Sequence, residues 1–537
     1  MKRSLVRRLA PMFLVAMVVA ACNGADPDDT ADEVVDDVDE TVDDVDDEEE
    51  EVEEDAAADD EIVVGVADLP ASDGNPYSGI GSPGIYTWAA IYDALTLVDR
   101  DGAPQPALAT DWEAAEDGWT FELREGVSFS NGEPFTADDV VATITYLTED
   151  EEGQDLAVAG DLGPVTGAEA VDESTVRILT ESPDPILPNR MAGVFIAPGD
   201  HLEAVGHDGL AAEPIGTGPF QVESWTSQEE VQLTAFEDSW RAPEAASLQI
   251  IQLDDTAARV EALLSDQVHL TLQVSPDQLE RIQQEGYAVE ADPAPQVMSL
   301  AFMVEGNEDS PVADVDVRRA MNFAVNAEAA ADALLAGEAR PAGQGATPGA
   351  FGYNPDVPPF PHDPEQAQEL LADAGYPDGF SFTAEIVTGS FPADAELYQA
   401  MQQDLAQVGI EVELQQIDFP EWLDKYFGNA WEGDAFGLSW NTAPFLDALR
   451  PYNIFTCDRE PPFYCDEEAH ELIEQARTEL DEEQREQILF ELQAHTHENP
   501  PAILLVEQVD LNARSEALQG FVSQNRFFNY HELSLAQ

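Results

Sequence analysis

The stretches DPEQAQELLADAG (363–375) and AELYQAMQQDLAQVGIEVEL (395–414) decide the fold class of this chain. In the first, Asp363 is suited to cap a helix, Pro364 to take its first position, and Gly375 to end it. The second predicts a helix that stops at its glycine, followed by a strand in which apolar and polar residues alternate. This alternation of helix and strand indicates an α/β architecture.

The length of the chain, 537 residues, is too great for one compact core, so we expect two or three domains or lobes. Hydrophobic residues make up 44% of it, which is ordinary for a globular protein and sufficient for a large folded body. A buried-strand pattern, IVVGV (62–66), opens that body. Three cysteines are too few for a disulfide-built scaffold or a multi-cysteine metal site.

The charge of the chain is extreme, because 111 Asp and Glu against 21 Lys and Arg give a formal net charge of −90. Such a field repels the nucleic-acid backbone and anionic membrane surfaces, which excludes both as partners. The excess persists beyond residue 61, where 88 acidic residues face 17 basic ones. We interpret it as adaptation to high salt, which screens the self-repulsion. A base-composition bias that favours Arg over Lys is an alternative source of part of the pattern.

The N-terminus has the build of a bacterial lipoprotein signal peptide. Basic residues precede an apolar stretch over 9–21, which is short for a transmembrane helix. The small residues VAA (19–21) lead directly into Cys22. This pattern predicts a signal peptide over 1–21 and lipid attachment at Cys22, so that the membrane is contacted through the lipid anchor only. An ordinary secretory signal with a chance cysteine is the alternative, and the export route, general or twin-arginine, stays open.

An acidic run follows, in which 23 of the 36 residues from Asp26 to Glu61 are Asp or Glu and none is basic. A run of this kind repels itself, cannot bury a core and stays extended. We therefore predict a disordered acidic tether over 22–60 that links a lipid anchor to the folded body. Low-affinity cation binding is the alternative reading of the run.

Tight-turn dipeptides mark the first part of the body. Asp117-Gly118 and Asn131-Gly132 separate alternating apolar runs and predict a pair of β-hairpins. The segment PIGTGPF (214–220) is a sharp turn rich in Gly and Pro. It lacks the lysine and the spacing of a phosphate-binding loop, so we assign it a structural role.

These segments, read in order, resemble family 5 of the extracellular solute-binding proteins, which serve dipeptide, oligopeptide and nickel ABC transporters. The resemblance extends from about residue 61 to the end of the chain, and its ordered motifs are more specific together than singly. The segments that carry it are LATDW (108–112), DGWTFELREGV (117–127), FSNGEPFTADDV (129–140), PIGTGPF (214–220), VRRAMNFAVN (317–326), DPE (363–365) through AGY (374–376), PPAILL (500–505) and Gly520-Phe521.

The resemblance implies an α/β clamshell of the type II periplasmic-binding-protein kind, with two lobes joined by two hinge crossings. A solute binds between the lobes, closure buries it, and a membrane permease with its ATPase subunits receives it. No cofactor is implied, and we expect a monomer. The implied divisions are lobe I over 61–90, 216–304 and 500–537, an inserted subdomain of lobe I over 91–215, and lobe II over 305–499.

The resemblance also indicates where a ligand would bind. Dipeptide-binding relatives hold the peptide ammonium with an Asp, expected here in the loop 437–447, and the carboxylate with an Arg, expected near 388–392. Asn441 and Thr442 stand where the Asp is expected, Asp447 is the nearest carboxylate, and the second segment contains Phe391 but no Arg. A dipeptide held by its ends is therefore disfavoured, and the alternatives are a longer peptide held by backbone hydrogen bonds or a neutral solute stacked on Trp440.

Six candidate ligand-binding residues follow from this comparison. We expect Trp440 to stack on the solute, with a place in the core as the alternative, and Asp447 to pair with a ligand ammonium, with a loop or helix-cap role as the alternative. Tyr86 and Trp88 follow the first strand, in a segment that borders the cleft in relatives. The full set is Trp440, Asn441, Asp447, Phe391, Tyr86 and Trp88.

Cys457 and Cys465 remain as an even pair in an exported chain, and relatives with two cysteines in this segment support a loop-closing disulfide between them. Two free buried thiols are the alternative.

The sequence gives little support to two other functions. An enzyme is disfavoured, because GLSWN (437–441) approaches the nucleophile elbow of hydrolases but lacks its final glycine. A protein that binds a metal directly is disfavoured because the best histidine pair, His495 and His497, points to different faces of a predicted helix. A metal held through an organic chelator, an oligosaccharide as solute, and a purely structural surface lipoprotein remain as alternatives.

Overall fold

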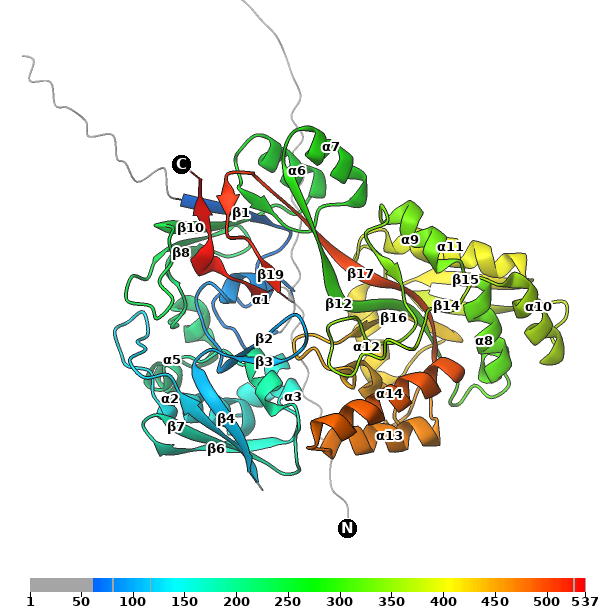
Figure 1. Ribbon diagram of the computed structural model, residues 1–537, viewed down its shortest axis with the longest axis horizontal. Helices are drawn as coiled ribbons and strands as arrows, with labels where there is room; N and C mark the ends of the chain where they lie inside the picture. Colours follow the sequence, from blue (N-terminus) through cyan, green and yellow to red (C-terminus); the bar gives the residue numbers. More distant parts are fainter. Residues whose placement is uncertain (1–60, 80–81, 116, 525–526, 537) are drawn as a thin grey trace, which may run out of the picture. The chain divides into compact units, whose positions relative to one another are not determined.

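The computed structural model describes residues 61–79, 82–115, 117–524 and 527–536 (Figure 1). The predicted signal peptide, the lipid attachment at Cys22 and the acidic tether lie outside the described residues. Within the described part of the chain, no helix has both the length and the apolar character needed to span a membrane.

A mixed sheet of eleven strands organises the fold. Its strands lie in the order β15 (Ile410–Gln416), β14 (Phe380–Ile386), β16 (Ala435–Asn441), β12 (Ala288–Phe302), β17 (Ala502–Arg514), β11 (Leu270–Thr271), β1 (Glu61–Val66), β10 (Ser247–Gln252), β9 (Glu230–Ala235) and β8 (Phe220–Thr226), with β13 (Arg340–Pro341) paired to β17. β1 contains the predicted strand over 62–66, which is confirmed.

The two longest strands, β12 and β17, are antiparallel neighbours that belong to both halves of this sheet (Figure 1). Near one end of β17, Arg514 pairs with Leu270 of β11, and β11 pairs in turn with β1. Toward the other end, β12 pairs with β16 from Gln296 to Phe302. The register of the two strands shifts between Pro293 and Val297. Two long strands that cross between the halves are what the predicted two-crossing hinge requires.

The crossing strands carry carboxylates in an unusual state. Burial raises the pKa of Glu507 on β17 to about 7, with Arg340 opposing the shift, and burial raises the pKa of Asp292 on β12 to about 6. Both groups therefore bind a proton more readily in the folded chain than in the unfolded one.

Replacing Glu507 with glutamine is expected to remove a pH dependence of stability. Folding raises the pKa of Glu507, so protonation of this carboxyl favours the folded state. That contribution to the free energy of unfolding is full below the pKa of Glu507 in the unfolded chain and is lost as pH rises through about 7. The loss amounts to at most about 3 kcal/mol. Urea denaturation of both proteins at pH 5 and pH 8 measures the free energy of unfolding. Relative to the natural chain, Glu507→Gln should be more stable at pH 8 than at pH 5. An equal difference at both pH values would contradict the expectation.

A separate four-stranded sheet, in the order β4 (Ala109–Ala115), β5 (Gly118–Leu123), β7 (Thr175–Thr180) and β6 (Val165–Asp172), lies within the segment predicted as an insertion. The β4–β5 pairing confirms the first predicted hairpin. Gly118 has a φ of 146°, and a Cβ there would lie 1.9 Å from the carbonyl oxygen of Ile178. The turn therefore requires glycine. Asn131-Gly132 lies in a turn closed by a bridge between Ser128 and Pro134.

The segment over 214–220 packs directly on the backbone before β2 (Thr96–Val98). A Cβ on Gly216 would lie 2.1 Å from the carbonyl oxygen of Ile91, so the two backbones meet at this point. Thr217 Oγ1 donates to Asp93 Oδ2 at 2.8 Å, and the same oxygen accepts from Trp240 Nε1. The contacts agree with the structural role predicted for this segment.

The helices of the second half of the chain begin and end close to the predicted residues. Asp363 caps α10 (Pro364–Asp373) by accepting from Gln366 N, and α11 (Asp394–Gln407) leads into β15. The other helices of four residues or more are α1 (Ser82–Trp88), α2 (Ala137–Glu149), α3 (Ala157–Asp161), α4 (Leu187–Arg190), α5 (Gly199–Ala212), α6 (Thr256–Leu264), α7 (Leu279–Gln284), α8 (Val315–Ala324), α9 (Ala327–Leu334), α12 (Phe419–Gly428), α13 (Glu467–Thr478), α14 (Glu482–Glu498) and the 3₁₀ helix Arg450–Ile454.

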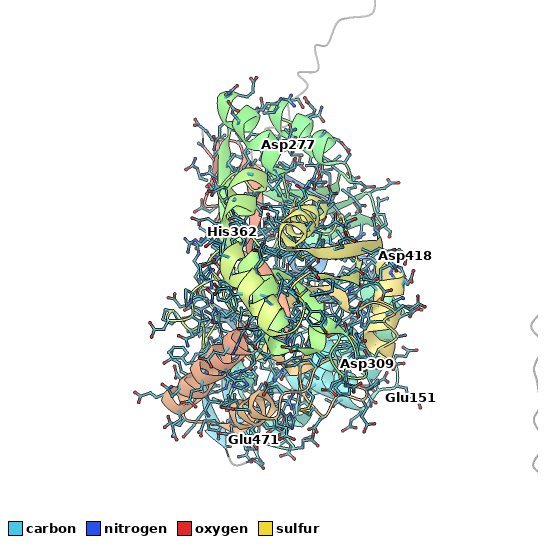
Figure 2. All side chains as sticks on the ribbon, turned by 90° about the vertical axis from the view of Figure 1, so that its right-hand side faces the viewer. Glu151, Asp277, Asp309, His362, Asp418 and Glu471 are labelled. Carbon is cyan, nitrogen blue, oxygen red and sulfur yellow. A yellow bond between two sulfur atoms is a disulfide. The ribbon has the colours of Figure 1, made fainter. Side chains whose placement is uncertain are left out.

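The acidic residues of the body are spread over its surface. Figure 2 shows exposed carboxylates projecting from elements far apart in sequence, among them Glu151, Asp277, Asp309, Asp418 and Glu471. Salt would screen the repulsion among these carboxylates.

Candidate functional site

A cavity of about 510 Å³ lies between two parts of the chain that are far apart in sequence. One side comes from residues 160–190, in the segment predicted as an insertion, and the other from residues 445–485, in the predicted lobe II. The volume falls within the range typical of sites for small molecules. A larger groove of about 870 Å³ lies on α2 and α5, but residues 133–206 alone line it. We therefore take the cavity with two sides as the candidate site.

The loop after β16 forms one wall of this cavity and is tied to the crossing strand β12. Thr442 N donates to the carbonyl oxygen of Pro295 at 2.9 Å, and Asn441 Oδ1 accepts from Ala443 N at 2.8 Å. Arg450 Nη1 donates back to the carbonyl oxygen of Asn441 at 3.0 Å. These bonds fix the path of the loop, so movement of β12 relative to its surroundings would carry the loop with it.

Direct contacts join the two walls. Asn189 Nδ2 donates at 2.8 Å both to the carbonyl oxygen of Gly102 and to that of Phe445 across the cavity. The guanidinium groups of Arg190 and Arg450 lie 5.2 and 5.6 Å from the centre of the Phe445 ring. The two walls are therefore held together by side chains from both sides.

The charges of the cavity occur in pairs. Arg190 Nε donates to Asp184 Oδ2 at 2.7 Å. Burial raises the pKa of Asp184, and the charge of Arg190 opposes that shift. Arg450 Nη2 lies 3.4 Å from Asp161 Oδ1, a longer contact between opposite walls in which both side chains are about one quarter exposed. It is the longest ion-pair contact among the residues that line the cavity, so it is a candidate for exchange with a charged ligand.

Trp440 lies in the core, as in the alternative given above, and not on the cavity wall. Its side chain is 2% exposed, and Nε1 donates to Ser299 Oγ at 2.8 Å. The ring stacks on Phe455 with a centroid distance of 4.6 Å. Gly345 lies so close that a Cβ on it would approach the ring to 2.1 Å. In this structure the ring is enclosed by protein, so stacking on a solute would require it to be uncovered.

Asp447 borders the cavity, but its carboxylate is already bound. Arg485 Nη1 and Nη2 donate to its two oxygens at 2.6 and 2.9 Å, and Leu449 N donates at 3.0 Å. The two side chains of the ion pair are 1% and 3% exposed. The expected contact with a ligand ammonium is thereby replaced by a buried ion pair.

Tyr86 and Trp88 are core residues as well, 3% and 2% exposed. The Tyr86 ring stacks on Phe528 at 4.9 Å, and Trp88 Nε1 donates to the carbonyl oxygen of Asp73 at 2.9 Å. Neither residue lines the cavity of the candidate site. The expectation that they border the solute is not met in this structure, because helix α1 turns both rings into the core.

Phe391 and Asn441 are half-buried, and their loops are occupied by local bonds. The carboxylate of Asp394 accepts from the backbone N–H groups of Gly389, Ser390 and Phe391 at 2.9, 2.9 and 3.1 Å. The segment that would hold an Arg in dipeptide-binding relatives is thus closed on itself. Separately, the structure joins Cys457 and Cys465 in a disulfide.

Most residues of the cavity were not predicted from the sequence, among them Asp161, Arg190 and Arg450. Asp161 and Arg450 are 289 residues apart, so no local pattern joins them. The rarity of basic residues was the available signal, because four of the few arginines line this one cavity: Arg190, Arg450, Arg477 and Arg485.

The sequence of the chain is similar to those of known solute-binding proteins. The family model described as bacterial extracellular solute-binding proteins, family 5 Middle, matches residues 103–461. Di/tripeptide-binding protein 2 of Pseudomonas aeruginosa (strain UCBPP-PA14) is 28% identical over 473 residues, which cover 80% of this chain and 86% of the relative.

Solved structures share the fold. The periplasmic binding protein DppA from Helicobacter pylori, in complex with the peptide STSA, aligns with a TM-score of 0.73 at 22% identity over 89% of this chain and 98% of that chain. NikA from Staphylococcus aureus, in complex with Ni(L-His)2, aligns with a TM-score of 0.70 at 19% identity over 89% of this chain and all of that chain. These similarities confirm the predicted two-lobed α/β fold.

Proposed function

Since this chain belongs to family 5 of the bacterial extracellular solute-binding proteins, we propose that it captures peptides between its two lobes and delivers them to the permease of an ABC importer. The family assignment makes it an extracytoplasmic solute-binding component of such an importer, and its relatives are binding proteins, not enzymes. ATP hydrolysis belongs to the partner subunits. The name of the relative from Pseudomonas and the ligand of the Helicobacter structure support peptides as the solute class.

The ion pair between Arg450 and Asp161 carries the proposal at the site. It joins opposite walls of the cavity at 3.4 Å, and each partner keeps about one quarter of its side chain exposed. A peptide carries a carboxylate and an ammonium, so one of its ends could compete for a member of the pair, the carboxylate for Arg450 or the ammonium for Asp161. Hydrogen bonds to charged groups contribute about 1.5–3 kcal/mol each.

An oligopeptide fits the site better than a dipeptide held as in dipeptide-binding relatives. The positions where such relatives would anchor the two ends are engaged in local bonds here: Thr442 Oγ1 donates to the carbonyl oxygen of Pro295, and Asp394 ties up the loop around Phe391. A longer chain can bind through its backbone and reach the charged pair of the cavity with one of its ends.

The N-terminal part of the proposal concerns location. We infer that Cys22 carries the lipid, that residues 22–60 form a tether, and that the body acts as a monomer at the outer face of the cell membrane. The support is the run of small residues before Cys22 and the acidic run after it. The acidic surface supports a high-salt habitat.

The test is to purify the full chain from the membranes of its own cells in high salt and record its native mass spectrum. The chain is expected to begin at Cys22 with attached acyl groups and to release peptides longer than two residues.

A sugar or a metal–chelate complex as the released molecule would overturn the peptide assignment while leaving the family intact. A mature chain without acyl groups would overturn the lipid anchor. If no molecule is retained, the stripped protein is offered a pool of synthetic peptides, and failure to retain any of them would also contradict the proposal.

A further inference from the structure

Three side chains that could bind a metal ion converge beside the disulfide loop, and the sequence had indicated no metal site. Asp458, His470 and Glu474 each offer one ligand atom, and these atoms all lie within 4.8 Å of one another. His470 and Glu474 are one turn apart on α13, so the helix presents both on the same face. Asp458 comes from the loop that the Cys457–Cys465 disulfide closes. From this arrangement we propose a site for a divalent transition-metal ion.

The loop that holds Asp458 is fixed from several sides. Asp458 directly follows Cys457, which is held by the disulfide. The guanidinium of the next residue, Arg459, lies 4.1 Å from the ring centre of Phe463 and 5.0 Å from that of Tyr426. Loss of side-chain and loop freedom on metal binding is therefore small, which favours affinity.

Among the described residues, the ring nitrogens of His470 lack close hydrogen-bond partners. Its Nδ1 is buried and has no hydrogen-bond partner within the described part of the chain. Its Nε2 lies 3.7 Å from Asp458 Oδ2, which is too long for a hydrogen bond. Nε2 is the ring nitrogen that faces Asp458, so an ion between the imidazole and the two carboxylates would bind through Nε2.

The ligand set indicates which ions bind. One imidazole and two carboxylates, with water at the remaining positions, suit Zn²⁺ and its neighbours in the first transition row. Mg²⁺ and Ca²⁺ prefer oxygen ligands alone. Glu474 now pairs with Arg477, which must give up that carboxylate when the ion binds; Arg477 keeps Asn453 Oδ1, at 3.1 Å, as a partner.

The ion would link the disulfide loop to α13 and so stabilise this corner of the fold. The site borders the candidate cavity, because Glu474 lines that cavity, whereas Asp458 and His470 do not. For that reason the test uses variants of Asp458 and His470, which leave the cavity wall unchanged.

The experiment titrates the mature chain with Co²⁺ in high salt and excess Mg²⁺, followed by the visible absorption of cobalt with a nitrogen ligand. One equivalent is expected to bind and to be displaced by Zn²⁺. His470→Ala and Asp458→Asn should each weaken binding by about tenfold or more. His362→Ala, which changes an exposed histidine labelled in Figure 2, should bind as the natural chain does.

Asp458 is exposed, so Asp458→Asn tests the site without risk to folding. Weak binding of many equivalents that Mg²⁺ abolishes would mean that only the general acidic surface attracts the cation, and would overturn the proposal. Unchanged cobalt affinity in both variants would overturn it as well.

Discussion

Replacing Arg485 with methionine is expected to lower the free energy of unfolding by about 3–5 kcal/mol. The substitution keeps most of the volume of the side chain but removes both hydrogen bonds to Asp447, whose carboxylate is 1% exposed. A carboxylate that is buried without its cation destabilises the folded state, because its loss of hydration is not compensated by an opposite charge. Urea denaturation followed by circular dichroism measures the change.

A matched control is available on the surface. Arg281 donates to Glu261 at 2.7 Å, close to the 2.6 Å of the buried pair, but the two side chains are 47% and 62% exposed. Arg281→Met is therefore expected to change stability by less than about 1 kcal/mol. The double variant Asp447→Asn with Arg485→Met should recover part of the loss, because no unpaired charge remains. Equal effects of Arg485→Met and Arg281→Met would contradict the assignment of a buried structural pair.

Replacing Trp440 with alanine is expected to cost about 3–5 kcal/mol as well, through the cavity left in the core. The ring packs against Phe455 and Tyr452, and Nε1 bonds to Ser299. Trp440→Phe keeps an aromatic ring and should lose less than half as much. Chemical denaturation of the two variants gives the comparison.

The same pair of variants distinguishes a packing role from a binding role. If Trp440 is a core residue, solute affinity measured on the folded fraction stays within about twofold in Trp440→Phe, because the ring does not touch the cavity wall. A Trp440→Ala protein of natural stability with weakened solute binding would instead return Trp440 to the site.

Local structure was largely predictable from the sequence because its signals are local. The cap at Asp363, the glycine after the helix, and the Asp117-Gly118 turn each act over a few residues, and each occurs where predicted. Ordered motifs along the chain also led to the correct family. Backbone geometry and turn chemistry therefore determine these features without reference to distant residues.

The candidate site was predicted poorly because its contacts are distant in sequence. Asp447 stands in the loop expected to bind the solute, but its partner Arg485 comes from α14, 38 residues later. The sequence pattern of a strand also does not show whether a tryptophan faces the core or a ligand cleft. In the structure, Trp440 on β16 packs against Phe455 and Gly345. Aromatic and charged residues near a cleft satisfy either role until the packing is known.

The most direct test of the central claim is hydrogen exchange by mass spectrometry, with and without the molecule that the protein releases or retains. A solute held between two walls should slow exchange in residues 160–190 and in residues 445–453 together, because both segments line the same cavity. Both segments are expected to be protected at the same solute concentration, and the protection is expected to be smaller in Arg450→Met. Protection of one segment alone, or only of the groove on α2 and α5, would contradict it.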